Sequence, residues 1–457
     1  MRLLVIGGDA AGMTAAGGVL RRRDDAEVVV VERGSHTSYS MCGIPYYVGG
    51  LIDEADDLVV RSPDEFREQG ITVHMHTEAT RIDPDERRVT VRDLSSGEER
   101  TEPYDALVYA TGAHPVVPPL PGLAEHGYVV HTLDEGERLR RLLDERPDIR
   151  TVAVVGAGYI GLEIAEALVE RGLGVHLIDR KSQVMRTLDA DMAAKLEESI
   201  VALGVELHLG ESLEEVRTSD GRCHEVATDA GCYEADAVVL AMGGRPNVDV
   251  AATAGCEVGA SGALRVDARM RTTVPGIWAA GDVVESRDLV AGRAVNVQLG
   301  THANKQGKVA AIDIAAQPDD GVATFPGVVA TAVTRVCQWD VARVGLTEEQ
   351  AREAGIDHAA VAFTGTARAG YMPDAGTVHV KMLAEAGTGR VLGAQLIGTG
   401  NVAKRIDVAA VWCHLRVPVQ DAQLMDLSYA PPFGGVWDLL QVAARKLTAE
   451  LDLSPRL

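Results

Sequence analysis

The chain has 457 residues, too many for a single hydrophobic core, so we expect two to four domains. Its 67 acidic residues outnumber its 44 lysines and arginines, and the net charge of −23 makes nucleic acid and anionic membranes poor partners. No apolar run reaches the roughly 18 residues of a membrane span, and the N-terminal residues lack a signal-peptide pattern. The six scattered cysteines argue against disulfides or a metal centre and fit a cytoplasmic location.

The first 32 residues have the pattern of a βαβ dinucleotide-binding unit. A strand is predicted over 2–6, a helix of small residues over 13–23 and a second strand over 27–31. The glycine-rich turn 7–12 lies where a pyrophosphate meets a helix N-terminus, although Asp9 replaces the middle glycine of GxGxxG. Glu32 follows the second strand and is placed to bind a ribose hydroxyl.

The segment 38–47 follows this unit and contains a single cysteine, Cys42. The glycine and proline beside it predict a tight turn at the start of a helix. The positive end of a helix lowers the pKa of a thiol and favours the thiolate. The alternative is a small buried apolar side chain, which is the common environment of a free cysteine.

A second unit spans 151–179, and its turn 156–161 has all three glycines of GxGxxG. A helix is predicted over 162–171 and a strand over 174–178. Asp179 follows that strand and favours NADH over NADPH, whereas the neighbouring Arg180 weakens this preference. Two such units imply two bound dinucleotides in one enzyme.

The remaining chain adds further strands. One ends in Ala110-Thr111-Gly112, and the stretch 235–247 parallels it. Another, over 274–283, contains Gly281-Asp282, whose carboxylate can accept hydrogen bonds from a ribityl chain. From about residue 324 short strands, one of them over 331–339, and two helices, over 402–415 and 436–447, predict a packing or dimerisation domain.

These motifs together resemble the pyridine nucleotide-disulfide oxidoreductase family, over essentially the whole chain. The resemblance implies an α/β fold with two Rossmann-like domains, for FAD and NAD(P)H, and a C-terminal α+β domain that forms a homodimer. The implied boundaries are 1–115 and 246–323 for the two parts of the FAD domain, 116–245 for NAD(P)H and 324–457 for the interface domain.

Thr37 and Tyr47 occupy positions where two-cysteine members carry a second cysteine. The chain therefore resembles the single-cysteine branch, which includes coenzyme A-disulfide reductase, NAD(P)H oxidase, NADH peroxidase and persulfide or polysulfide reductases. Ala10 stands where the oxidase and peroxidase types place a histidine, and the segments 42–46, 370–373 and 429–433 resemble coenzyme A-disulfide reductase.

The resemblance assigns roles to individual residues. Cys42 is the implied redox centre, and Asn304 lies on the substrate side. Tyr371 and Tyr429 reach the cysteine site from the partner subunit, with ordinary interface packing as the alternative role of these two tyrosines. Ser38, Arg21 and Arg22 are candidates for substrate binding, although the two arginines also suit the end of a helix. The implied FAD-binding residues are Gly7, Gly8, Ala10, Ala11, Gly12, Glu32, Arg33, Ala79, Ala110, Thr111, Gly112, Gly281 and Asp282. The implied NAD(P)H-binding residues are Gly156, Gly158, Tyr159, Ile160, Gly161, Glu163, Asp179, Arg180 and Gly243.

A lone redox cysteine has two useful oxidised forms, a mixed disulfide with a small thiol and a sulfenic acid. We therefore predict reduction of a small disulfide by NAD(P)H through FAD and Cys42. Coenzyme A disulfide or a related persulfide or polysulfide is the expected substrate. The alternatives are an NAD(P)H oxidase that reduces oxygen or peroxide, and a redox-sensing flavoprotein with little turnover.

Overall fold

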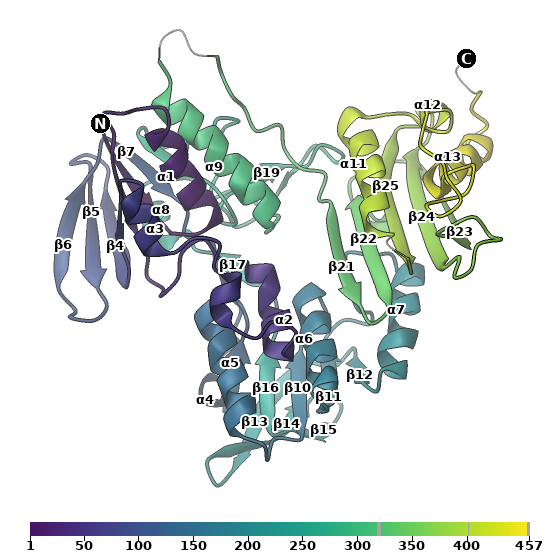
Figure 1. The fold of residues 1–457 in the computed structure, drawn as a ribbon, viewed down its shortest axis with the longest axis horizontal. Helices are drawn as coiled ribbons and strands as arrows, with labels where there is room; N and C mark the ends of the chain where they lie inside the picture. Colours follow the sequence, from purple (N-terminus) through teal and green to yellow (C-terminus); the bar gives the residue numbers. More distant parts are fainter. Residues whose placement is uncertain (318–320, 401, 455–457) are drawn as a thin grey trace.

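The computed structural model describes residues 1–317, 321–400 and 402–454. Three sheet-centred lobes follow one another in Figure 1, one at each side and one below. Among the described residues, none of the helices combines the length and the hydrophobicity that a membrane-spanning segment requires. The predicted mixed α/β architecture, with two parallel-sheet Rossmann-like halves and a separate C-terminal unit, is confirmed.

The first sheet is parallel and has the order β18-β7-β1-β2-β3. Its strands are β1 (Arg2–Ile6), β2 (Glu27–Val31), β3 (Ile71–His74), β7 (Ala106–Tyr109) and β18 (Ile277–Ala279). The helices α1 (Ala10–Leu20) and α9 (Gly300–Ala315) share an apolar core with one face of this sheet. The antiparallel sheet β4 (Thr77–Asp83), β5 (Arg88–Asp93) and β6 (Glu99–Pro103) shares a core with the other face.

The two helices α1 and α9 approach closely because small residues lie between them. A Cβ on Gly307 would lie 2.3 Å from the backbone oxygen of Ala11, and one on Gly18 would lie 2.6 Å from the Cβ of Ala311. The helix predicted over 13–23 begins earlier, at Ala10, directly after the glycine-rich turn, and ends earlier, at Leu20.

The second sheet repeats this plan, with the parallel order β12-β11-β10-β16-β9. Its strands are β9 (Gly127–Val129), β10 (Thr151–Val155), β11 (Gly174–Asp179), β12 (Glu206–Leu209) and β16 (Ala237–Leu240). One face packs on α5 (Leu133–Glu145), α6 (Tyr159–Glu170) and α7 (Ala190–Ala202). The other face packs on the antiparallel strands β13 (Leu213–Ser219), β14 (Arg222–Thr228) and β15 (Cys232–Glu234).

The two halves are joined by a short antiparallel pair, β8 (Ala113–Pro115) with β17 (Gly244–Pro246). Asn247 stabilises this pair through two hydrogen bonds to Thr111. Its amide nitrogen donates to the Thr111 carbonyl at 2.7 Å, and the Thr111 hydroxyl donates to the Asn247 carbonyl at 3.0 Å. The two similar motifs that the sequence contains, 110–112 and 243–247, therefore meet at the junction between the nucleotide-binding halves.

The third sheet is antiparallel, with the order β21-β22-β25-β24-β23. Its strands are β21 (Ala332–Val336), β22 (Trp339–Gly345), β23 (His358–Thr366), β24 (Thr377–Glu385) and β25 (Val391–Gly398), and it packs on α11 (Ile406–Leu415) and α13 (Leu439–Glu450). The single strand predicted over 331–339 is wrong in part. The chain turns back at Cys337, whose φ of 54° is left-handed, and a hairpin results.

The remaining elements are short. They are η1 (Met41–Gly43), α2 (Ile44–Gly49), η2 (Ala55–Leu58), α3 (Pro63–Glu68), α4 (Leu123–His126), α8 (Asp249–Thr253), β19 (Ser286–Arg287), β20 (Ala294–Val295), α10 (Glu348–Glu353), η3 (Ala403–Arg405) and α12 (Val419–Ala422). The helices α1 and α6 begin three residues before their predicted starts, whereas α11 and α13 begin after the predicted starts at 402 and 436.

A buried lysine links the second and third sheets. The side chain of Lys381 is 6% exposed, and its Nζ lies 2.7 Å from Asp191, 2.5 Å from Glu348 and 3.4 Å from Asp189. Burial would lower the pKa of Lys381, but its hydrogen bonds to Asp191 and Glu348 raise it overall. The ammonium group is therefore charged and fixes the C-terminal unit against α7.

Candidate active site

The two glycine-rich turns have the same backbone geometry. Gly7 and Gly156 have φ values of 105° and 109°, and a Cβ there would lie 2.2 and 2.3 Å from a backbone oxygen of the neighbouring strand end. A Cβ on Gly12 or Gly161 would lie 1.9 or 1.8 Å from the oxygen of the first glycine of its own turn. Both turns therefore bring backbone N–H groups to a helix N-terminus, the arrangement that binds phosphates.

The acid at the end of each second strand closes its turn in the same way. Glu32 accepts hydrogen bonds from the N–H groups of Gly8 and Gly34, both at 2.7 Å. Asp179 accepts from Ala157 at 2.7 Å and from Lys181 at 2.9 Å. Each carboxylate is fixed by two backbone donors, and its remaining lone pairs suit the ribose hydroxyls that the predicted role requires.

Asp9 occupies the middle position of the first turn. Its φ of −110° is ordinary for any residue, as is the φ of −84° at Gly158, so this position does not need glycine for conformational reasons. Burial, together with the charges of Glu32 and Asp282, raises the pKa of Asp9 to about 6, although backbone hydrogen bonds from Ala10 and Tyr39 oppose the shift.

Asp282 follows strand β18, and burial alone raises its pKa to about 6. Its neighbour Gly281 has a φ of 88° and donates its N–H to Gln306 Oε1 at 2.8 Å. The backbone at the strand end is thus held by Gln306, and the Asp282 carboxyl beside it is half-buried. Such a half-buried acceptor suits the hydroxyl groups of a ribityl chain, and the residues present fit FAD.

Cys42 lies in the turn η1, directly before α2. Its side chain is exposed in the single chain. The predicted lowering of its pKa is wrong for this chain. Partial burial of the sulfur raises the pKa of the thiol, and the negative charges of Glu163 and Asp282 raise it further. The helix α2 has only six residues, and its N-terminal field is outweighed by these two effects.

The acid beside the thiol comes from the second nucleotide-binding half. Glu163 lies on α6 and accepts a hydrogen bond from Thr334 of β21, and burial raises the pKa of Glu163. Tyr159, at the start of the same helix, accepts a hydrogen bond from Thr187 at 3.2 Å. Sequence reasoning missed Thr334 and Thr187, because only the folded chain brings them to α6.

The predicted substrate-binding residues differ from one another in their hydrogen bonds and exposure. Asn304 lies on α9 and accepts a hydrogen bond from Thr14 of α1 at 2.8 Å, so part of its role is to join these helices. Arg22 bends back to the carbonyl of Gly18 at 2.9 Å, and Arg21 is exposed at the end of α1. Ser38 has a left-handed φ of 47° and donates its N–H to Gly8. Their contacts with a substrate stay predictions.

The two predicted tyrosines lie together on the C-terminal unit. Both are exposed, and a hydrogen bond to Tyr429 raises the pKa of Tyr371. Two further large apolar side chains that follow in the chain, Phe433 and Val436, are also exposed.

The remaining predicted cofactor residues lie at or near the two turns. Ala10 and Ala11 open α1, and Gly8 is buried beside Glu32. Arg33 is exposed after Glu32, while Ala79 is half-buried on β4. Ala110, Thr111 and Gly112 follow β7, Gly243 precedes β17 with a φ of 88°, and Ile160 and Arg180 are exposed at the second turn. Their contacts with a cofactor stay predictions.

Sequence comparison settles the family. The pyridine nucleotide-disulphide oxidoreductase pattern matches residues 1–307, and the dimerisation domain of that family matches residues 331–439. The chain belongs to the pyridine nucleotide-disulphide oxidoreductase family. The resemblance on which the sequence analysis rested is thereby confirmed.

Members of this oxidoreductase family resemble the chain over its whole length. It is 36% identical over 451 residues to an NAD(P)H coenzyme A polysulfide/persulfide reductase of Pyrococcus horikoshii, covering 98% of each chain. A solved NAD-dependent persulfide reductase from A. fulgidus superposes with a TM-score of 0.94 at 37% identity, covering 99% of this chain and 84% of that one. A water-forming NADH oxidase from Lactobacillus brevis, solved with NADH, gives 0.94 at 29% identity and covers 99% of both chains.

Proposed function

We propose that this oxidoreductase uses NAD(P)H and FAD to reduce a small disulfide, persulfide or polysulfide, with a coenzyme A disulfide as the expected substrate. The observation that carries the proposal is the position of Cys42. Its thiol is exposed, and its pKa is raised by the negative charges of both Asp282 in the first nucleotide-binding half and Glu163 in the second, which supports a thiol that is close to both halves. We also propose a cytoplasmic location.

The first turn, Glu32 and Asp282 would hold FAD, and the second turn and Asp179 would hold the nicotinamide nucleotide. When bound, the flavin supplies a two-electron relay between the nicotinamide and the thiol. The protein would orient the two nucleotides from its two parallel sheets, and the thiol would receive its electrons through the flavin. Tyr159, which the Thr187 hydroxyl holds at the start of α6, would move aside when the nicotinamide binds.

Cys42 forms the covalent intermediate. Its thiolate attacks one sulfur of the substrate disulfide, a mixed disulfide forms on Cys42, and the other sulfur leaves as a thiolate that takes up a proton. Two electrons from NAD(P)H then cleave the mixed disulfide, which releases the second thiol and restores the Cys42 thiolate. The balance is one NAD(P)H and one proton consumed for two thiols formed.

The active site of the proposed homodimer is shared across subunits. The match of the C-terminal residues to a dimerisation domain supports a dimer, and the exposed pair Tyr371 and Tyr429 supplies two phenol groups for the partner's site. Phenol hydroxyls can donate hydrogen bonds to a thiolate or a leaving thiol.

The proposal is tested by Cys42→Ser in the FAD-loaded enzyme, with coenzyme A disulfide as acceptor and thiol release as the readout. We expect FAD to stay bound and NADH-dependent thiol release to fall at least 1000-fold, on the order of the loss of a catalytic nucleophile. Cys232→Ser is the matched control, since Cys232 is also exposed but lies on β15. Full turnover in Cys42→Ser refutes the role of Cys42.

An NAD(P)H oxidase is the second candidate, because the Lactobacillus brevis relative is a water-forming NADH oxidase. The methyl side chain of Ala10 cannot transfer a proton. The first turn therefore supplies no general acid at this position for peroxide cleavage at Cys42. If oxygen is the substrate, Cys42→Ser still consumes oxygen with NADH. A redox sensor with little turnover would show NADH bleaching of the flavin without rapid recovery when the disulfide is added.

A further inference from the structure

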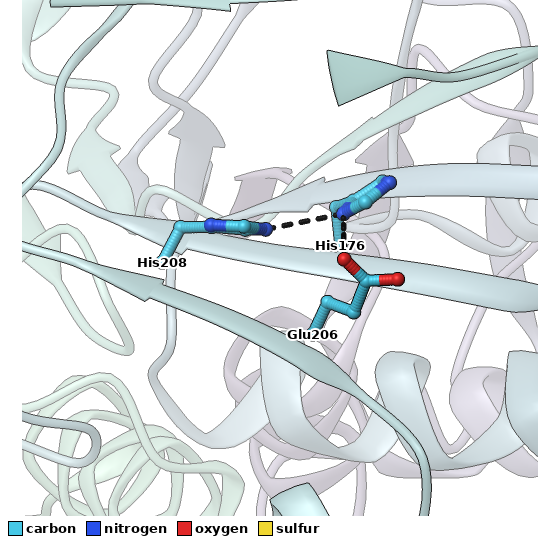
Figure 2. Close-up of side chains that lie close together, drawn as sticks. All are labelled: His176, Glu206 and His208. Atoms are coloured by element: carbon cyan, nitrogen blue, oxygen red, sulfur yellow. Dashed lines mark hydrogen bonds and ion pairs between the residues drawn. The ribbon is translucent and has the colours of Figure 1, made fainter. Parts of the chain in front are cut away.

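Three potential metal ligands lie together at the edge of the second sheet, away from the two glycine-rich turns. His176 lies on β11, and Glu206 and His208 lie on the neighbouring edge strand β12. The register pairs His176 with Glu206 and Ile178 with His208, so the three side chains share one face of two parallel strands. In Figure 2 the imidazole of His208 and the carboxylate of Glu206 both point toward His176.

We propose that these three residues bind a first-row divalent cation, with Zn²⁺ as the preferred ion. His176 Nδ1 lies 3.1 Å from His208 Nε2 and 3.5 Å from Glu206 Oε2. In a tetrahedral zinc site with bonds of roughly 2.0–2.1 Å, neighbouring donor atoms are about 3.3 Å apart. Two of the three donor-atom distances are therefore close to the spacing that a bound zinc ion imposes, and all three donor atoms lie within 4.8 Å of one another.

The surroundings hold the two imidazoles in place. The ring of Tyr233 stacks on His208 at 3.9 Å between centroids and lies 5.3 Å from His176. On the far side of His208, Nδ1 faces Glu211 Oε1 at 3.9 Å, and Glu211 Oε2 accepts hydrogen bonds of 2.8 Å from Thr228 and Tyr233. A carboxylate behind the second ring nitrogen is the usual support of a metal-binding histidine.

The exposure of the three ligands suits binding from solution. The side chains of His176 and His208 are 12% and 16% exposed, whereas that of Glu206 is 69% exposed. The nitrogen ligands are thus fixed within the protein and the carboxylate closes the site from the solvent side, leaving a further position for water. Two imidazoles and one carboxylate favour Zn²⁺ over Mg²⁺ or Ca²⁺, which prefer oxygen ligands.

The cluster is connected to the nucleotide-binding edge of the same half. Its strand β11 ends at Asp179, and the N–H of Glu211 donates to the Asp179 carbonyl at 3.1 Å. A cation that joins β11 to the edge strand β12 would therefore stabilise this half of the protein. Cysteine spacing could not indicate the site, because its ligands are histidine and glutamate from two separate strands.

A direct hydrogen bond between the two imidazoles is the competing explanation for their short separation. In that case an N–H of one ring donates a hydrogen bond to a nitrogen of the other, and no ion is needed. Metal titration of the FAD-loaded enzyme separates the two. After treatment with a chelator, we expect ZnCl₂ titrated by calorimetry to bind wild type with one more equivalent than His176→Asn or His208→Asn. The melting temperature should rise with zinc in wild type and in neither variant. His224→Asn, an exposed histidine on β14, is the matched control and should behave as wild type.

Glu206→Gln covers the case in which a histidine variant fails to fold, because this side chain is mostly exposed. It should retain FAD and bind zinc at least 10-fold more weakly. Equal zinc stoichiometry and affinity in wild type, Glu206→Gln and the folded histidine variants would overturn the site. The outcome is independent of disulfide reductase activity, so a failure here and a failure of Cys42→Ser are distinguishable.

Discussion

Two substitutions in the second glycine-rich turn distinguish an effect on protein stability from an effect on nucleotide binding. A Cβ on Gly158 would have no atom within 4 Å, and its φ of −84° suits alanine. A Cβ on Gly161 would lie 1.8 Å from the oxygen of Gly156, which is backbone and cannot rotate away. Gly158→Ala therefore changes mainly the space that a pyrophosphate would use, whereas Gly161→Ala forces the helix away from the turn.

The magnitudes follow from these distances. Real Cβ atoms essentially never come closer than 3.0 Å, so Gly161→Ala must move the helix start and the turn apart by about 1.2 Å. Overpacking of this kind costs ~1–3 kcal/mol, and the better helix propensity of alanine returns at most about 1 kcal/mol. For Gly158→Ala we expect a cost of about 1 kcal/mol or less, from the poorer N-cap.

The assay is anaerobic stopped-flow reduction of the bound flavin over a range of NADH concentrations, with urea unfolding in parallel. Gly158→Ala should weaken NADH binding at least 10-fold at near wild-type stability, because the added methyl prevents close approach of the phosphates. Gly161→Ala should lose both stability and NADH binding. FAD content should not change in Gly158→Ala, since the first turn is untouched. Wild-type NADH affinity in Gly158→Ala would refute the placement of the nucleotide.

Three further predictions concern charges. Lys381→Met leaves the 9%-exposed side chain of Asp189 without its ion pair and should cost about 3 kcal/mol in urea unfolding, against less than ~0.5 kcal/mol for the exposed control Lys195→Met. The pKa of Asp282, raised from 3.8 to about 6, means that the FAD-free protein loses up to about 3 kcal/mol of stability as the pH rises from 4 to 6. Asp282→Asn should remove that loss, and an unchanged pH profile would contradict it. Glu163→Gln should lower the pH at which iodoacetamide alkylates Cys42, measured by peptide mass spectrometry; no change would exclude the charge effect.

The nucleotide-binding halves could be predicted because a βαβ unit is a local pattern. Its turn, helix and terminal acid lie within about 30 residues, and their spacing is fixed by the geometry of the unit. The acids Glu32 and Asp179 are therefore found where the sequence placed them. The hairpin at Cys337 was missed because a left-handed φ at a residue other than glycine has no clear sequence signal.

The electrostatics of the thiol could not be predicted for a related reason. Thr334 and Glu163 are 171 positions apart, and no periodicity in the sequence connects them. The expected lowering of the Cys42 pKa considered only the local helix, whereas the structure adds two carboxyl groups from distant segments. Long-range contacts of this kind decide the charge balance of a site, and local patterns do not contain them.

The negative charges around Cys42 affect how its thiol can be activated. In a single chain, Glu163 and Asp282 oppose the Cys42 thiolate, so a thiol reactive at neutral pH needs stabilising groups from elsewhere. We propose that the exposed phenols of Tyr371 and Tyr429 are such groups, because a hydrogen bond between them raises the pKa of Tyr371 and keeps its hydroxyl protonated as a donor. If the partner subunit supplies them, dilution to monomers should raise the pH at which Cys42 reacts, and a profile independent of protein concentration would argue against a shared site.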